Sequence, residues 1–292
     1  MTPPDQIGPA TIAASVKSIP QPVAAAKSGK SAELAMKLFP PVLVFILAIL
    51  GWIGLHYGLS EEKAITVPLP WDVIEIGFLD STNLSFILDG LWISAKAAIV
   101  GLAVTIVLGL AFAVAMSQAK WVENALLPYA IAMQTTPILA LVPLIGVVIG
   151  FDFISRVIVV VLISVFPFIN NALFGLLSAE KSQHDLLTLH DASRWTRLVK
   201  LQLPAALPAI FTGLRVAAVM AVVGAVVGDF FFTQGDSGLG QLISLDASQL
   251  QYERMYAEVI LAMFLGIAAY LSVAFFERRA IGKWHTATRA GV

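Results

Sequence analysis

The chain has 292 residues, of which 58% are hydrophobic and 13% are charged, and its formal net charge is −1. Ordinary soluble domains carry about 25% charged residues, so this composition excludes a typical soluble domain. The absence of cysteine excludes disulfides, thiolate metal sites and a cysteine nucleophile.

Residues 1–36 consist mainly of Ala, Pro, Ser and Lys, with few large apolar side chains. Such a segment cannot bury enough surface to fold, so we expect a disordered cytoplasmic tail. A cleavable signal peptide is not expected, because the first apolar run starts late and is long enough to remain as a span.

Six hydrophobic blocks follow, each close to the ~20 residues that cross a bilayer as a helix. Backbone groups in hydrocarbon must be satisfied internally, so the blocks predict an all-α polytopic membrane protein with six transmembrane helices. Lys96 and Arg215 lie inside blocks, and we expect both side chains to reach the membrane interface. The blocks run over about Leu38–Tyr57, Leu91–Met116, Ala125–Ile149, Val157–Leu177, Ala206–Phe232 and Val259–Phe276.

Lysine and arginine are distributed unevenly between the two sides of these spans. If the N-terminus is cytoplasmic, most basic residues lie inside and the outer loops are acidic, which the positive-inside rule favours. We therefore expect both termini, including the tail 284–292, to be cytoplasmic. The inside residues are Lys17, Lys27, Lys30, Lys37, Lys120, Lys181, Arg194, Arg197, Lys200, Arg278, Arg279, Lys283 and Arg289.

Polar groups inside the blocks are candidates for a translocation path, because they are costly in hydrocarbon unless they face a cavity or a partner. The third block contains "MQTTP", in which Pro137 weakens the helix, and its threonines either line a cavity or only patch the kink. The asparagines after Pro167 either form a gate or bond across helices. Asp229 either meets an external partner or is a solvated helix end. The path residues assigned are Gln134, Thr135, Thr136, Asn170, Asn171 and Asp229.

The fifth block carries small residues at every fourth position. Such a stripe permits close approach of another helix, either within the subunit or across a two-fold axis. Its members are Ala217, Ala221, Gly224, Ala225 and Gly228.

The loop 178–204, between the fourth and fifth blocks, predicts two short amphipathic helices that meet at Asp191. Ser193 is a suitable N-cap for the second helix, and Pro204 is expected to end it, with Leu203 pushed out of the right-handed helical region. Apolar spacing places Trp195, Leu198, Val199 and Gln202 on one face. Taken alone, this pattern is typical of interfacial helices at anionic headgroups.

The order of residues in this loop, "HDASRWTRLVKLQLPAALPAI", resembles the cytoplasmic loop of permease subunits of ATP-binding-cassette importers, in the nitrate, sulfonate and taurine branch. The segments "TTPILALVPL", "FPFINNALFGL" and "GDFFFTQGDSGLG" support the resemblance, which covers about residues 91–283. It implies the type I importer permease fold over a single domain, 37–283, whose loop couples to an ATPase. Asp191 stands where the family has Gly, and leucines replace two small alanines. The coupling residues implied are Asp185, Leu186, Leu187, Asp191, Ala192, Ser193, Trp195, Leu203 and Pro204.

The resemblance also implies the partners: two cytoplasmic ATPase subunits, a second copy of the chain, a periplasmic or lipid-anchored solute-binding protein and membrane lipid, but no nucleic acid. ATP and Mg would be bound by the ATPase, because the chain lacks the G-x-x-x-x-G-K-[ST] phosphate loop. The chain itself is expected to hold no cofactor, no metal and no catalytic group. The compartment implied is the bacterial inner membrane.

The permease branch serves nitrate, sulfonates, taurine and bicarbonate, and also vitamin precursors such as pyrimidines and riboflavin. The segment "GDFFF" favours the vitamin-precursor group. The alternative function is an ion-coupled secondary transporter. That class should show acidic or histidine relays inside the spans, and the middle regions of the blocks contain no acidic residue.

Overall fold

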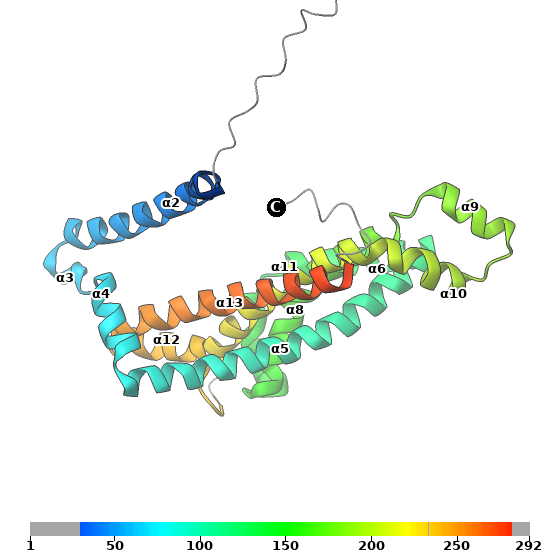
Figure 1. Cartoon of the computed structure of the whole chain (residues 1–292). Helices are drawn as coiled ribbons and strands as arrows, with labels where there is room; N and C mark the ends of the chain where they lie inside the picture. Colours follow the sequence, from blue (N-terminus) through cyan, green and yellow to red (C-terminus); the bar gives the residue numbers. More distant parts are fainter. Residues whose placement is uncertain (1–29, 233, 282–292) are drawn as a thin grey trace, which may run out of the picture. The chain divides into compact units, whose positions relative to one another are not determined.

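The computed structural model describes residues 30–232 and 234–281, and within these ranges the chain is helical with no strand (Figure 1). The chain divides into two units between Gly54 and Leu55. The first unit contains most of α2, Lys30–Gly58. Helix α2 begins at Lys30, within the range 1–36 predicted as a tail. Residues 1–29 and the tail 284–292 lie outside the described residues.

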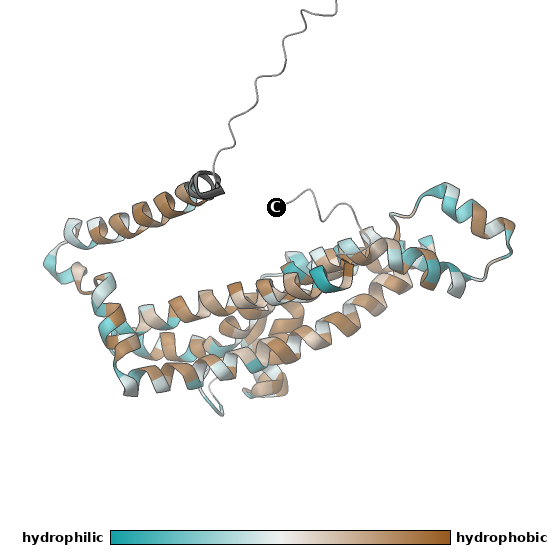
Figure 2. Ribbon diagram, viewed as in Figure 1, coloured by the Kyte–Doolittle hydropathy of each residue, from teal (hydrophilic) through white to brown (hydrophobic). Residues whose placement is uncertain are grey.

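Four long helices form the second unit: α5 (Ser81–Gln118), α8 (Phe153–Leu176), α11 (Leu203–Phe231) and α13 (Tyr252–Ile281). These four helices consist mainly of hydrophobic residues, whereas hydrophilic residues are concentrated on the short helices of the loop 178–204 (Figure 2). The shorter elements are α3 (Glu61–Ala64), α4 (Pro70–Asp72), η2 (Val73–Leu79), α6 (Lys120–Thr135), α7 (Ile138–Ile149), α9 (Lys181–Leu189), α10 (Arg194–Arg197), η3 (Leu198–Gln202) and α12 (Leu239–Ser248).

Aspartates fix the starts of two long helices. The side chain of Asp80 accepts hydrogen bonds from the backbone N–H groups of Thr82 and Asn83 at the start of α5. Asp152 accepts in the same way from Ile154 and Ser155 at the start of α8. These side chains satisfy backbone donors that have no partner within the helix.

Small residues bring α5 and α8 into close contact. A Cβ on Gly101 would overlap Val160, and a Cβ on Gly109 would lie 2.5 Å from Phe168. Between them, Thr105 Oγ1 and Ser164 Oγ lie 2.7 Å apart and buried. The hydroxyl pair gives the two helices a fixed register where backbones approach closely.

The small-residue stripe of α11 faces α8 within the same subunit. A Cβ on Gly224 would lie 2.8 Å from Val160 Cα, and Gly228 lies against Arg156. Ala217, Ala221 and Ala225 are almost fully buried. Of the two arrangements left open by the sequence, the structure therefore shows the intrasubunit one.

The third hydrophobic block is not one continuous helix. It divides into α6 and α7, whose axes differ by 97° at a break of at most 4 residues. The described residues thus contain 5 helices long and apolar enough to span a membrane, or 6 if the bent pair forms one span. A proline at the break explains the division, because it removes a helical hydrogen bond and its ring clashes with the preceding turn.

Candidate functional site

The loop 178–204 forms the two predicted short helices, α9 and α10. Between them Asp191 adopts a left-handed conformation with φ 45°, in the place where the resembling family has Gly. Ser193 Oγ accepts a hydrogen bond of 3.2 Å from the backbone N–H of Thr196 at the start of α10. The predicted turn and the predicted N-cap are both confirmed. Aspartate tolerates the left-handed conformation better than most residues do, and serine is a preferred N-cap residue.

The prediction that Pro204 ends the second helix is wrong. Leu203 is helical, with φ −62° and ψ −47°, and its N–H donates to the carbonyl of Leu198. This bond belongs to the π-helical turn η3, which joins α10 to α11 without a break. The wider turn accommodates the proline at the start of α11, where its missing N–H removes no required bond.

The predicted common face of the second helix is also wrong. Leu198 and Gln202 are buried against the bundle, and Gln118 Nε2 of α5 donates to Gln202 Oε1 at 3.3 Å. Trp195, by contrast, is 72% exposed, and Leu189 on α9 is 81% exposed. One side of the loop thus anchors to the spans, and the other presents apolar side chains outward.

The remaining coupling candidates divide in the same way. Asp185 and Leu186 are exposed on α9, whereas Leu187 and Ala192 are half-buried at its end and in the following turn. Pro204 is half-buried at the start of α11. The exposed members therefore lie on α9 and on the first turn of α10.

The bend of the third block carries the "MQTTP" candidates. Thr135 Oγ1 and Thr136 Oγ1 both donate to the carbonyl of Ala132, at 3.1 and 2.7 Å. Gln134 is exposed beside them. The hydroxyls thus patch the kink, and Gln134 is free to face a cavity.

The two asparagines of α8 do not bond across helices. Asn171 Nδ2 donates to the carbonyl of Pro167 one turn earlier, at 2.8 Å, and its Cβ lies where a side chain at Gly213 would need to be. Asn170 is exposed. Asn171 is therefore a packing residue between α8 and α11, and only Asn170 remains available to a path.

At the end of the bundle opposite the loop 178–204, three polar side chains form what we call the far-end clamp: Ser94, Arg156 and Asp229. Asp229 is fully buried, and its Oδ2 accepts a hydrogen bond of 2.5 Å from Ser94 Oγ. Arg156 Nη1 lies 3.4 Å from its Oδ1. Asp229 is therefore not a solvated helix end, and its buried carboxylate is paired with a charge of the same chain.

Arg156 also holds the segment that follows α11. Its guanidinium donates to the carbonyls of Phe232 and Asp236, at 2.7 and 2.9 Å. The predicted fourth block started at Val157 and left this residue out, but Arg156 lies inside α8 and is 2% exposed. The sequence did contain a signal for this ion pair. Arg156 borders the fourth block and Asp229 lies near the end of the fifth, on the same predicted side of the membrane.

The glycines of "GDFFFTQGDSGLG" have a steric explanation. A Cβ on Gly238 would overlap the Asp229 carboxylate, and a Cβ on Gly240 would overlap the carbonyl of Val226. Between them, the N–H of Leu239 donates to Ser94 Oγ at 2.8 Å. Glycine is required where backbone approaches this closely, so the motif folds back onto the clamp.

A second polar cluster joins α12 to α13. Asp246 is buried and accepts from Arg254 Nε and Nη2, at 2.8 and 2.6 Å. Glu258 is fully buried, and neither carboxylate oxygen has a hydrogen-bond partner among the described residues. Sequence reasoning missed Glu258 because the sixth block was started one residue later. Glu258 follows Arg254 by four residues, and this spacing places two residues on the same face of a helix. That spacing could have indicated that the two charged side chains are neighbours.

Arg215 does not extend to the interface as expected. Its Nη2 lies 2.8 Å from a carboxylate oxygen of Glu277 on α13, and its guanidinium carbon lies 5.8 Å from the ring centre of Tyr270. Glu258 and Glu277 lie directly outside the block Val259–Phe276, whose middle contains no acidic residue. No group of three His, Cys, Asp or Glu in the described part of the chain is arranged to hold a metal.

A bundle of long apolar helices, a bent pair of helices and an exposed helical loop continuous with one span are the features of a membrane protein with several spans. The chain belongs to the family of binding-protein-dependent transport system inner membrane components, whose profile matches residues 105–282. It is thus the permease subunit of an ATP-binding-cassette importer and a multi-pass membrane protein, and its family comprises transport permeases rather than enzymes.

Two relatives illustrate the substrate range of the family. The chain is 32% identical to the formylaminopyrimidine transport permease of Halalkalibacterium halodurans, over 61% of this chain and 70% of that protein. It is 27% identical to an aliphatic sulfonates transport permease of Bacillus subtilis, over 85% of this chain and 86% of that protein. The branch predicted from sequence is confirmed.

A solved structure shows the same fold. An amino acid ATP-binding-cassette transporter crystallised with histidines aligns with a TM-score of 0.56 at 17% identity, over 69% of this chain and 98% of that chain. The type I permease fold predicted from the sequence is therefore confirmed.

Proposed function

We propose that this permease forms the solute path of an ATP-driven importer together with a second copy of itself. Two cytoplasmic ATPase subunits, which bind the ATP and Mg, drive it, and an external solute-binding protein delivers the solute. The bias of lysine and arginine supports an orientation with both termini in the cytoplasm, and the family supports a location in the bacterial inner membrane.

The observation that carries this proposal is the exposed surface of the loop 178–204. Leu189 and Trp195 are among its most exposed apolar side chains, at 81% and 72%. Leu186 on α9 is also exposed, at 58%, although the short helices of the loop are otherwise largely hydrophilic (Figure 2). An exposed aromatic with aliphatic neighbours is a typical anchor for a groove on a partner protein.

The anchor is held by internal bonds, which supports a docking role. Arg197 Nε donates to the carbonyl of Ala192 at 3.2 Å across the turn, and Gln202 ties the helix to α5. A surface that is ordered before a partner arrives loses less entropy on binding. The loop is thus suited to receive force from an ATPase and pass it to α11.

The solute proposed is small and polar: either an anion such as nitrate, a sulfonate, taurine or bicarbonate, or a vitamin precursor such as a pyrimidine or riboflavin. The formylaminopyrimidine relative supports the second group and the sulfonate relative the first. Gln134 and Asn170, both exposed on spans, are the path residues that best fit this role.

The test is binding of the ATPase encoded beside this permease, measured by pull-down from membranes. Trp195→Ala should weaken binding by more than ~30-fold, since truncating a central aromatic anchor costs about 2 kcal/mol or more. A one-residue insertion after Asp191 should have a similar effect, because it turns α10 relative to α9. The matched control is Trp92→Ala on α5, which removes a side chain of 65% exposure at the opposite end.

Equal recovery of the ATPase with both loop variants would contradict the coupling assignment. Uptake that depended on a proton or sodium gradient and did not require ATP would contradict the importer mechanism. It would instead support the ion-coupled secondary transporter.

A further inference from the structure

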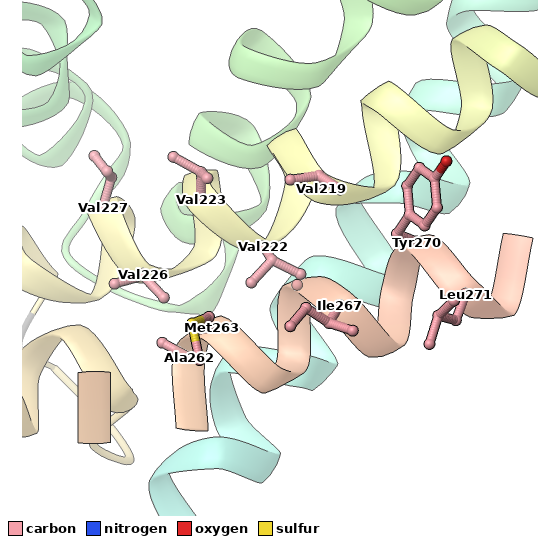
Figure 3. Close-up of a pocket in the computed structure, with 11 residues that line it drawn as sticks. Val219, Val222, Val223, Val226, Val227, Ala262, Met263, Ile267, Tyr270 and Leu271 are labelled. Carbon is pink, nitrogen blue, oxygen red and sulfur yellow. The ribbon is translucent and has the colours of Figure 1, made fainter. Parts of the chain in front are cut away.

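An apolar groove runs between α11 and α13. It has a volume of about 580 Å³ and is lined by valines of α11, such as Val222 and Val226, and by side chains of α13, such as Ile267 (Figure 3). Tyr270 is the one lining side chain that carries a polar atom. Sites for small molecules commonly have this size and this composition, with few polar groups that fix orientation.

Tyr270, at one end of the groove, is joined to Arg215 and through it to Glu277, two side chains that do not themselves line the groove. Arg215 Nη1 donates to the Tyr270 hydroxyl oxygen at 3.4 Å, and Arg215 Nη2 donates to Glu277 Oε1 at 3.0 Å. Because the phenol oxygen accepts from the guanidinium, its own proton remains available to an acceptor placed in the groove. The groove therefore offers a hydrogen-bond donor at one end of an aliphatic slot.

The same ion pair indicates what this flank faces. Arg215 lies about 18 Å along α11 from Leu203, at ~1.5 Å per residue, and its side chain is 27% exposed. Charged side chains inside spans face the bundle interior, a partner or a water-filled cavity rather than lipid. A charged side chain that is only partly buried at this depth therefore favours an aqueous path over contact with acyl chains.

The charges at this end cancel. Glu277 neutralises Arg215 at 2.8 Å, so the pair offers no unpaired cation that would hold a sulfonate or nitrate. Aliphatic walls and a tyrosine ring instead complement a flat, uncharged ring system. We propose that the α11–α13 groove is the solute-selecting part of the path and takes a neutral aromatic heterocycle, whose ring acceptor bonds to the Tyr270 hydroxyl. This inference rests on the proposed importer function.

The experiment uses the lack of cysteine in the chain, which makes single-cysteine variants clean. Ile267→Cys places a thiol in the groove, and Val107→Cys places one on α5 at an exposed position outside it. Membrane fragments containing the whole transporter are treated with a water-soluble maleimide. We expect labelling at position 267 and none at position 107.

Protection then identifies the solute class. Riboflavin or 4-aminopyrimidine, at ten times its Kd, should slow labelling of Ile267→Cys about tenfold, because about a tenth of the sites remain free. Ethanesulfonate should not slow it. Added to this background, Tyr270→Phe should weaken protection about 2- to 10-fold, the value of one hydrogen bond. Tyr57→Phe, which removes an exposed phenol elsewhere, is the matched control.

A gain of function completes the test. Glu277→Gln leaves Arg215 without its carboxylate partner, so ethanesulfonate should now protect the thiol at position 267. This outcome depends on the charge of the pair and not on stability alone, since a protein that fails to fold gains no ligand.

Several outcomes would overturn the inference. Absence of labelling at position 267 would assign the groove to lipid, and a disulfide between two copies of the Ile267→Cys variant would assign it to a second copy of the chain. Protection by ethanesulfonate alone, or by no probe, would reject the aromatic class. If ATP-dependent uptake persists in these cases, only the inference fails; if uptake does not require ATP, the proposed function fails as well.

Discussion

The far-end clamp and the loop 178–204 lie at opposite ends of the same long helix and are built on opposite principles. At the clamp, Asp229 is fully buried and bonded to Ser94 and Arg156, all within one chain. In the loop, Trp195 and Leu189 are mostly exposed, and the bonds there order the backbone without covering these side chains. The clamp thus pairs its two charges within the subunit, whereas the outer apolar side chains of the loop are not covered by the described part of the chain.

This difference separates residues that hold the fold from residues that serve a partner. Substitutions in the clamp should lower stability, and substitutions on the outer side of the loop should leave stability nearly unchanged while impairing docking. The predictions that follow test this separation, beginning with the largest expected effect.

Asp229→Ala should destabilise the protein by about 3–5 kcal/mol, because it leaves the Arg156 guanidinium buried without its carboxylate. The measurement is thermal unfolding of the detergent-purified chain, with recovery of folded protein as a second readout. The double variant Asp229→Leu with Arg156→Met should recover much of the loss, since it removes both charges. A single variant as stable as the parent would show that the pair is solvated.

Gly224→Ala should cost about 1–3 kcal/mol, because its Cβ would lie 2.8 Å from the Val160 backbone and must force α11 away from α8. The control is Gly266→Ala on α13, where no atom lies within 4 Å of the added Cβ. There we expect no loss, or a gain of up to about 1 kcal/mol from helix propensity. The measurement is the midpoint of thermal unfolding of each variant. If both variants lost the same stability, the small-residue stripe would not be in close contact with α8.

Asp191→Gly should have the smallest effect and the opposite sign. Glycine adopts φ 45° without the steric cost of a Cβ, so the loop should gain up to about 1 kcal/mol. Proteolysis of the loop in membrane fragments measures this local change, and ATPase binding should be retained. Faster cleavage than in the parent would show that the Asp191 side chain stabilises the turn.

Much of the fold could be predicted from the sequence, because hydrophobic length and turn residues report directly on local structure. The block Val157–Leu177 matches α8, and both the Asp191 turn and the Ser193 cap are present. Such features depend on neighbouring residues only. The family and the permease class followed from the order of motifs.

The failures have tertiary causes. Pro204 was expected to end a helix, but the π-helical turn η3 before it allows the helix to continue past the proline. Asp229 was expected either to meet an external partner or to be a solvated helix end, because its partners, Ser94 and Arg156, are distant in sequence and come from two other helices. The break at Pro137 was seen as a weakness, yet the 97° bend depends on what each half packs against.

The passage from α10 through η3 into α11 gives one uninterrupted helix, Arg194–Phe231, of 38 residues. At ~1.5 Å per residue it is about 57 Å long, and Trp195 and Asp229 stand near its two tips. A strut of this kind cannot shorten, so a tilt imposed at one tip must reappear as displacement at the other. A movement of Trp195 is therefore expected to displace the end of the helix that carries Asp229.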